Sequence, residues 1–147
     1  MGNNGLYNIL LVEDDPGEAR LALEVLRECK NLKSVDLATD GIHALDYLYQ
    51  RNQFKNVRRP DLIVLDLNLP KKDGRQVLAD IKKNENLKQI PVVILTMSNN
   101  DEDIKTAYSL HANCYIIKTL DFDEYSNLLV SVVNFWFTVV TLPHLAF

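Results

Sequence analysis

The hydrophobic residues of this chain fall into short continuous runs, separated by longer stretches in which apolar positions recur at helical spacing. Leu62–Leu65 contains four apolar residues in a row, bounded by Pro60 and Pro70. Such a run is typical of a strand buried on both faces of a parallel sheet. Short runs of this kind predict strands at Asn8–Val12, Val35–Thr39, Leu62–Leu65, Pro91–Thr96 and Cys114–Lys118.

The stretches between these runs predict helices. Asp15 as N-cap, Pro16 at the first helical position and Glu18 three residues after the cap make one helix start. Strand and helix alternate along the whole chain, which predicts a doubly wound α/β fold, because parallel strands need right-handed helical crossovers. We expect a five-stranded parallel sheet in the order 2-1-3-4-5, between two helical layers. The predicted helices cover 16–26, Ile42–Tyr49, Gly74 to about Asn84, Ile104–Tyr108 and Phe122–Phe137.

Polar side chains stand where the predicted strands end. Glu13 and Asp14 follow the first strand, Asp66 the third, Thr96 ends the fourth and Lys118 the fifth. Each has an ordinary explanation alone, since Asp66 could cap a turn and Lys118 could be an exposed strand-end lysine. The carboxyl ends of parallel strands share one edge of the sheet, where loops converge. Polar groups at four neighbouring ends therefore indicate a site.

The chemistry open to this set is limited. Asp14 and Asp66, with a main-chain carbonyl at Asn68, offer the hard oxygen ligands that Mg²⁺ prefers, and Mn²⁺ could substitute. Lys118 supplies a point charge for a phosphate, and the Thr96 hydroxyl can hydrogen-bond it. An aspartate carboxylate can attack phosphorus to give an acyl phosphate. The residues thus favour Asp66 as a phosphoryl acceptor.

Composition and charge argue against some classes of function. The chain has 147 residues, of which 47% are hydrophobic, enough for one domain with a real core. A net charge of -4 and a pI near 5.3 argue against nucleic-acid binding. Cys29 and Cys114 have no metal-ligand spacing and suggest reduced thiols. The N-terminus lacks a signal-peptide pattern, so we expect a cytoplasmic protein that binds neither nucleic acid nor membrane.

These motifs resemble the receiver domains of bacterial two-component response regulators. The resemblance covers roughly residues 8–136, and within the family it is strongest to stand-alone regulators that partner cyanobacterial phytochromes. It implies a flavodoxin-like, CheY-like three-layer sandwich forming one domain over 1–147, with a core at about 8–137 and an extension at 138–147. The segments that carry the resemblance are Val12–Asp15, Asp66–Gly74, Thr96, His111–Lys118 and Phe135–Pro143.

The resemblance implies a role for each strand-end residue. Asp66 would take a phosphoryl group from a histidine of a sensor kinase, a phytochrome-like one, in a Mg²⁺-dependent step. Asp14 and Asp66 would hold the metal directly, Glu13 would act through water, and Lys118 would contact the phosphoryl group. Slow hydrolysis of the protein's own acyl phosphate is expected, without turnover of external phosphoesters. The chain would then be a stand-alone response regulator, not a metabolic enzyme, that signals through protein contacts.

The resemblance also implies a switch. Thr96 would move toward the phosphate and Tyr115 would change rotamer, which alters the face built from the last two predicted helices and the last strand. A ligand that favours one of two packings shifts their populations. Two positions depart from the family pattern: Thr119 follows Lys118 where most receivers have proline, typically with a cis peptide, and His111 replaces a frequent glycine.

Other functions fit the residues less well. An aspartyl phosphatase would typically carry a second aspartate two residues after the nucleophile, where this chain has Asn68. A flavin-binding protein would need phosphate-binding groups after the first strand, but Glu13 and Asp14 would repel that phosphate. A docking module that works without phosphorylation stays an alternative, because Thr119 stands where most receivers have proline.

The helix predicted at Phe122–Phe137 is apolar on most sides. Such a helix needs a second burial surface besides the sheet, and its polar residues and length argue against a membrane span. We therefore expect an isologous homodimer that uses this helix and the tail Val139–Phe147. The alternative is a tail that folds back on its own domain. The predicted interface residues are Tyr125, Leu129, Val133, Trp136 and Phe137.

Overall fold

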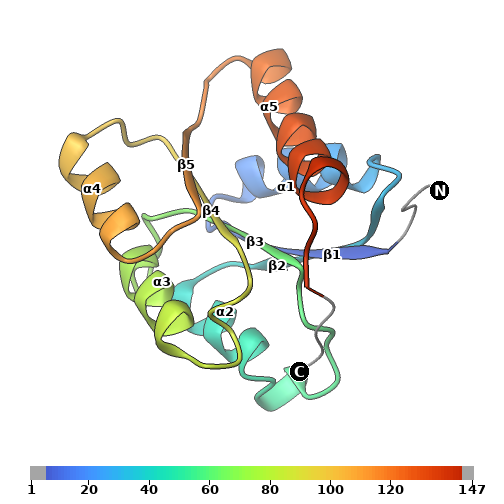
Figure 1. Ribbon diagram of the computed structural model, residues 1–147. Helices are drawn as coiled ribbons and strands as arrows, with labels where there is room; N and C mark the ends of the chain where they lie inside the picture. The colour runs from blue at the N-terminus through green and yellow to red at the C-terminus, as the bar shows by residue number, and fades with distance from the viewer. Residues whose placement is uncertain (1–5, 144–147) are drawn as a thin grey trace.

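A parallel sheet forms the centre of the computed structural model, which describes residues 6–143 (Figure 1). Its order is β2-β1-β3-β4-β5, and every neighbouring pair is parallel. The predicted strand order is therefore confirmed. The strands are β1 (Tyr7–Val12), β2 (Leu32–Ala38), β3 (Leu62–Leu65), β4 (Val92–Thr96) and β5 (Cys114–Ile117).

Helices follow the strands, and aspartate or asparagine caps fix where the helices begin. Each cap side chain accepts a hydrogen bond from a main-chain N–H in the first turn, which satisfies one of the free donors there. The caps of the five α-helices within residues 6–143 are Asp15, Asp40, Asp73, Asn100 and Asp121. The helices are α1 (Pro16–Arg27), α2 (Gly41–Leu48), α3 (Gly74–Lys83), α4 (Asp101–Ser109) and α5 (Phe122–Asn134).

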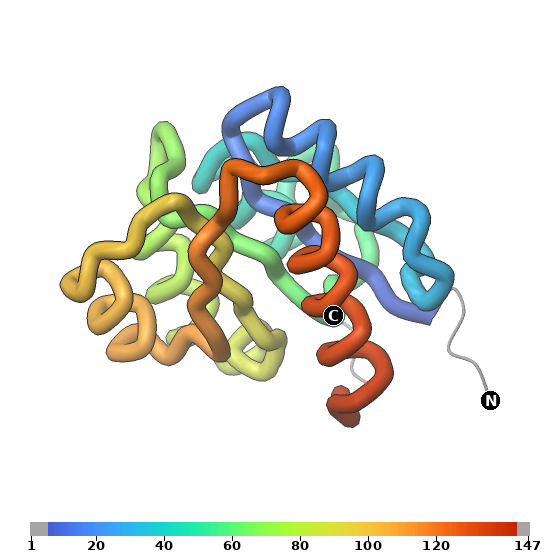
Figure 2. Tube along the Cα trace, turned by 90° about the horizontal axis from the view of Figure 1, so that it is seen from above, coloured from blue at the N-terminus to red at the C-terminus, as the bar shows by residue number. Residues whose placement is uncertain are grey.

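Successive residues of the central strands face two separate cores. On β1, Leu10 and Val12 pack in the core under α2 and α3, whereas Ile9 and Leu11 pack in the core under α1 and α5. Figures 1 and 2 show α1 and α5 side by side on one face of the sheet. The helices α2, α3 and α4 cover the other face. All residues of β3 and β4 are buried, as expected for strands covered on both faces.

The ends of several predicted elements differ from the structure, most of them by one residue, and α4 begins at Asp101, three residues before the predicted Ile104. β2 begins at Leu32, three residues before the predicted Val35, because it is an edge strand whose polar residues can face solvent. The predicted last helix is α5 followed by a π-helical turn at Phe135–Val139. The Phe137 ring stacks on Tyr7 of β1 with 4.4 Å between ring centroids, which holds this turn against the sheet. Between residues 6 and 143, no helix has the length and apolarity needed to cross a bilayer.

Candidate functional site

Polar side chains from four strand ends meet at the carboxyl edge of the sheet. Glu13 and Asp14 follow β1, Asp66 follows β3, Thr96 ends β4 and Lys118 follows β5. β1, β3, β4 and β5 are hydrogen-bonded neighbours in that order. Of these side chains Asp14 is exposed and the other four are buried. The residues singled out from the sequence thus lie together, largely shielded from solvent.

The ammonium group of Lys118 lies at the centre of this cluster. Its Nζ donates hydrogen bonds to Glu13 Oε1, to Glu18 Oε1 at 2.8 Å and to Asp66 Oδ2 at 3.0 Å. The Lys118 side chain is only 2% exposed. An ammonium group has three N–H donors, and all three are used here. Lys118 is therefore fixed beside the predicted phosphoryl acceptor.

Glu18 is a member of the cluster that sequence reasoning missed. From the sequence, Glu18 is explained only by the start of α1, where its main-chain N–H does donate to Asp15 Oδ1 at 2.9 Å. Its side chain, 40% exposed, turns toward Lys118. The first turn of a helix that follows a parallel strand lies at the carboxyl edge of the sheet. That placement is the signal by which Glu18 could have been found.

Burial and charge act against each other in this cluster. Burial raises the pKa of the Glu13 carboxyl group to about 7, although the hydrogen bond and charge of Lys118 lower it. Burial alone would lower the pKa of Lys118, but its hydrogen bonds to Glu13 and Glu18 and the charge of Asp66 raise it above the usual value. The lysine keeps its proton, yet carboxylates outnumber it. A further cation would relieve the remaining repulsion.

The loop after β3 fixes the Asp66 carboxylate. The main-chain N–H of Asp66 donates to Val12 O at 3.1 Å, and Asp66 Oδ1 accepts from the main-chain N–H of Asn68 at 3.1 Å. Asn68, whose carbonyl is a predicted metal ligand, is thereby held next to Asp66. Gly74 packs on the same loop so closely that a β-carbon would lie 2.3 Å from Asp66 O. A side chain at Gly74 would push the loop out of place.

The carboxylates of Glu13, Asp14 and Asp66 could hold a divalent cation. One oxygen from each lies within 4.8 Å of the others. Both Glu13 oxygens already accept hydrogen bonds, Oε1 from Lys118 and Oε2 from the Asp15 N–H at 3.1 Å. Both Asp66 oxygens do so as well, Oδ1 from the Asn68 N–H and Oδ2 from Lys118, so hydrogen bonds alone do not decide which carboxylates would bind the cation directly. Hard oxygen donors with excess negative charge fit Mg²⁺ or Mn²⁺.

Thr96 and Tyr115, the predicted switch residues, both contact the loop between β4 and α4. Thr96 is fully buried, and its carbonyl accepts from the Lys118 N–H at 2.7 Å. Thr96 Oγ1 lies 3.5 Å from the nitrogen of Ser98. The Tyr115 hydroxyl donates to Ser98 O at 3.0 Å. The half-buried Tyr115 ring packs against the core under α2 and α3. A displacement of this loop would therefore affect both side chains.

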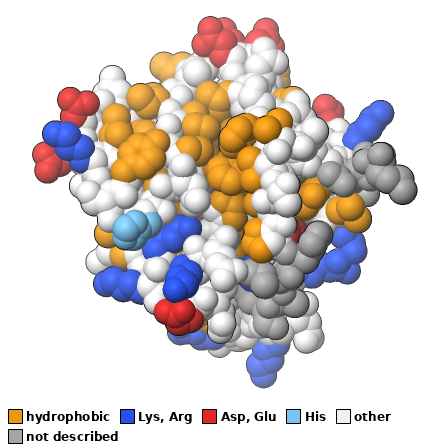
Figure 3. Space-filling view, in the orientation of Figure 1, with side chains coloured by type: hydrophobic (Ala, Val, Ile, Leu, Met, Phe, Trp, Pro, Cys, Tyr) orange, Lys and Arg blue, Asp and Glu red, His pale blue; other side chains and the backbone are white. Residues whose placement is uncertain are grey.

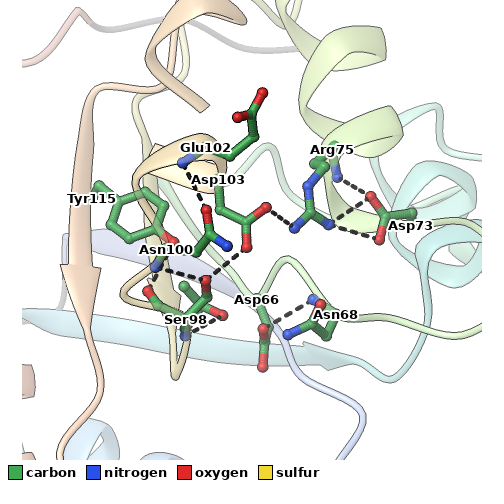
Figure 4. A network of polar contacts seen from close by, with 10 residues as sticks. Asp66, Asn68, Asp73, Arg75, Ser98, Asn100, Glu102, Asp103 and Tyr115 are labelled. Carbon is green, nitrogen blue, oxygen red and sulfur yellow. Dashed lines mark hydrogen bonds and ion pairs between the residues drawn. The ribbon is translucent and has the colours of Figure 1, made fainter. Parts of the chain in front are cut away.

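A second set of charges ties this loop to α3 (Figure 4). Arg75 Nη2 donates to Asp103 Oδ1 at 2.6 Å, and Ser98 Oγ donates to Asp103 Oδ2 at 2.6 Å. Arg75 Nη1 lies 3.1 Å from both carboxylate oxygens of Asp73, the cap of α3. We call Asp73, Arg75, Ser98 and Asp103 the Arg75 network. Sequence reasoning missed it because Arg75 and Asp103 are 28 residues apart and share no local pattern.

The two departures from the family pattern are accommodated locally. The Lys118–Thr119 peptide bond is trans, like the other peptide bonds within residues 6–143. Thr119 Oγ1 donates to the main-chain oxygen of Asp121, the cap of α5, at 3.1 Å, which closes the loop without proline. His111 is exposed and has φ of 71°, a left-handed conformation that favours glycine.

Most of the residues predicted for the dimer interface are not on the surface. Four of the five lie at successive i+4 positions that face the sheet, and they are buried in the core of a single chain, so they offer no free surface. The fifth, Trp136, is half-buried. Part of the predicted tail, 144–147, lies outside the described residues. The buried four are Tyr125, Leu129, Val133 and Phe137.

Comparison with known proteins matches this arrangement. The model of the response regulator receiver domain matches residues 9–129. Response regulator Rcp1 of Synechocystis sp. is 46% identical over 135 residues, which cover 92% of each protein. The probable methanogenesis regulatory protein FilR2 of Methanothrix harundinacea is 39% identical over 130 residues, covering 88% of this chain and 83% of the relative.

Solved structures have the same fold. The phosphorylated cyanobacterial phytochrome response regulator RcpA has a TM-score of 0.90 and 45% identity, covering 94% of this chain and 99% of that one. The Mn²⁺-bound form of Rcp1 has a TM-score of 0.89 and 45% identity, with the same coverage. Receiver domains bind Mg²⁺, and they are signalling proteins rather than metabolic enzymes.

Proposed function

This chain belongs to the response regulator receiver family, and on that premise we propose that Asp66 accepts a phosphoryl group from a histidine of a sensor kinase. The observation that carries the proposal is the 3.0 Å contact between Lys118 Nζ and Asp66 Oδ2, inside a cluster of carboxylates at the carboxyl edge of the sheet. A cation fixed beside a buried nucleophile is what transfer of a negatively charged group requires.

The transfer uses the residues of the cluster in distinct roles. A carboxylate oxygen of Asp66 attacks phosphorus, so a P–O bond forms while the P–N bond of the phosphohistidine breaks. The electron pair of that bond leaves on the imidazole nitrogen. Asp14 and Asp66 would coordinate Mg²⁺, with Glu13 acting through water, and the bound ion would neutralise charge on the transferred group. Lys118 donates to a phosphoryl oxygen, and Thr96 supplies its hydroxyl.

The phosphoryl group then changes the protein's contacts through the loop between β4 and α4. Movement of Thr96 toward the phosphoryl oxygens shifts the loop that also carries Ser98. Because Ser98 O accepts from the Tyr115 hydroxyl, that hydrogen bond is lost or remade as the loop moves. The changed packing of Tyr115 alters the face formed by α4, β5 and α5.

The phosphodonor we propose is a phytochrome-like histidine kinase. Rcp1 and RcpA support this assignment, because RcpA is a phytochrome response regulator and both match this chain over nearly its whole length. By analogy with Rcp1, 92% of which matches this chain, the proposed output is a protein contact. The acyl phosphate would hydrolyse slowly, and the protein would act in the cytoplasm.

A second copy of this chain is the proposed partner for the face formed by α4, β5 and α5. Hydrophobic side chains gather on that face in Figure 3. They replace the buried residues first predicted for the interface, and they would form an isologous contact. Size-exclusion chromatography with light scattering tests the assembly with and without phosphoryl group. The exposed apolar residues of these elements and the π-helical turn include Tyr108, Ile117, Phe135 and Val139, whereas Phe122 and Val130 line a hollow between α5 and α1 and are not assigned to this face.

Intact-mass analysis after incubation with acetyl phosphate and Mg²⁺ tests the acceptor chemistry. We expect one phosphoryl adduct on the wild type, and none on Asp66→Asn or in the presence of a chelator. The same samples should be incubated with the phosphorylated kinase. A folded, Mg²⁺-replete wild type that gains no phosphoryl group from either donor would contradict the proposal and favour a docking module that works without phosphorylation.

A further inference from the structure

Glu18 stands apart from the other partners of Lys118. Glu13 and Asp66 are buried, whereas the Glu18 side chain is 40% exposed and lies on the first turn of α1. Its Oε1 nevertheless lies 2.8 Å from Lys118 Nζ, as close as an ordinary charge-assisted hydrogen bond. The Lys118 ammonium group is thus held partly by a carboxylate that reaches in from the surface.

A count of donors shows why this contact matters. Lys118 Nζ has three N–H donors, and Glu13, Glu18 and Asp66 occupy all of them. A phosphoryl oxygen on Asp66 can be bound by Lys118 only if one present partner gives up its place. Asp66 is the attacking group and stays beside Lys118, and Glu13 is buried and would be left without solvent, which is costly. Glu18 can turn into water, where exposed ion pairs contribute little.

Glu18 also adds negative charge beside Lys118 and lines a cavity next to the loop that follows it. A cavity of about 260 Å³ is lined by Glu18 on one side, by Thr119 and Asp121 on another, and by apolar side chains including Met97 and Leu120. Thr119 directly follows Lys118, so this cavity adjoins the site. Glu18 and Asp121 make its lining acidic. The Glu18 carboxylate, 2.8 Å from Lys118 Nζ, also repels a small dianionic phosphodonor that approaches the cation.

We propose that Glu18 is a releasable partner of Lys118 that restrains the reaction of Asp66 with small anionic phosphodonors. The inference rests on the proposed phosphoacceptor function and adds a positioning residue to it. While Glu18 holds Lys118, the site has no free ammonium donor and carries one more negative charge. Once Glu18 turns outward, Lys118 can donate to the incoming phosphoryl oxygen.

The test compares Glu18→Gln with wild type in the full chain. The initial rate of phosphorylation by acetyl phosphate, followed by intact mass with Mg²⁺ in excess, should rise about three- to tenfold, because one nearby negative charge is removed. Glu18→Asp keeps the charge but is one methylene shorter and loses the contact, so its rate should rise less. Glu24→Gln is the matched control, because Glu24 lies on the same helix and pairs only with exposed Arg20.

A readout that needs no phosphoryl transfer separates this inference from the proposed function. Beryllofluoride, a non-reacting phosphoryl mimic, should bind Glu18→Gln about three- to tenfold more tightly than wild type in an NMR titration with Mg²⁺. Tighter binding supports the inference even if acetyl phosphate proves to be no donor. Rates and mimic affinities of Glu18→Gln equal to or below wild type would overturn it. So would a Glu18→Asp variant that matches wild type while Glu18→Gln is faster.

Discussion

The cluster around Lys118 and the Arg75 network each place one cation among several carboxylates, but their surroundings differ. In each, one cation contacts carboxylates that come from separate elements. The Lys118 side chain is 2% exposed, whereas that of Arg75 is 27% exposed. Water therefore screens the excess negative charge around Arg75 and has little access to that around Lys118.

The pKa shifts of one carboxylate in each region run in opposite directions for this reason. Burial raises the pKa of Glu13 to about 7. At the Arg75 network, the hydrogen bonds from Ser98 and Arg75 lower the pKa of Asp103. A buried excess of carboxylates favours a bound cation or a proton, whereas a solvated pair needs neither. The comparison teaches that burial, more than the presence of ion pairs, leaves the carboxylates around Lys118 in need of a further cation or proton, whereas those around Arg75 are satisfied by solvent.

Lys118→Met should have the largest effect on stability. It leaves Glu13 and Asp66 buried without their cation, and breaking a buried pair in this way costs about 3 to 5 kcal/mol. Urea unfolding at pH 8 without metal measures the loss. Near pH 5 the loss should shrink, because Glu13 can then take up a proton. An equal loss at both pH values would contradict the assignment of the penalty to buried carboxylates.

Asp14→Asn should separate metal binding from stability. Asp14 is the exposed member of the Glu13–Asp14–Asp66 cluster, and its charge repels the other two. We expect Mg²⁺ affinity to fall roughly 10- to 100-fold, and thermal stability in chelator to rise slightly. Isothermal titration calorimetry measures the Mg²⁺ affinity, and thermal unfolding in chelator measures the stability. The prediction fails if the variant loses both metal affinity and metal-free stability.

The pH dependence of Mg²⁺ binding follows from Glu13. Its folded pKa of about 7 lies above the ordinary 4.5, so the folded protein holds an extra proton between these values. The stability gained from that proton is complete below pH 4.5 and is lost as the pH rises through 7. Since the cation competes with the proton, the Mg²⁺ dissociation constant should rise about tenfold per pH unit below 7. Titrations at pH 5.5, 6.5 and 7.5 measure it, with Glu13→Gln as the control that should flatten the dependence.

Much of the fold could be predicted because the hydrophobic pattern and the helix caps indicate the same strands and helices. Continuous apolar runs mark β3 and β4, and caps such as Asp15 and Asp40 stand immediately before helices. The strand order and the meeting of Asp66 with Lys118 follow from the rule that parallel strand ends share an edge. The start of β2 was missed because an edge strand tolerates polar residues.

Side-chain directions could not be predicted from the same signals. Glu18 has an adequate local role at the start of α1, and nothing in the sequence indicates that its side chain reaches Lys118. The face of α5 was misjudged because the sheet and α1 together bury a wide arc of it. Tyr125 and Val133, both predicted for the dimer interface, lie instead on one buried i+4 stripe.

Arg75→Met should have the smallest effect and completes the comparison. The methionine keeps most of the aliphatic stem but leaves Asp73 and Asp103 to water, which reaches both. We expect the midpoint of thermal unfolding to fall by about 2 to 4 °C, with phosphorylation of Asp66 retained. Because Asp103 also accepts from Ser98, the loop that carries Ser98 O should loosen, and the Tyr115 ring signals in NMR spectra should broaden or shift. The exposed pair Arg20–Glu24 supplies the control, since Arg20→Met should leave those signals unchanged. A loss of stability as large as that of Lys118→Met would mean that solvent does not screen the Arg75 network. The contrast between the two regions would then fail.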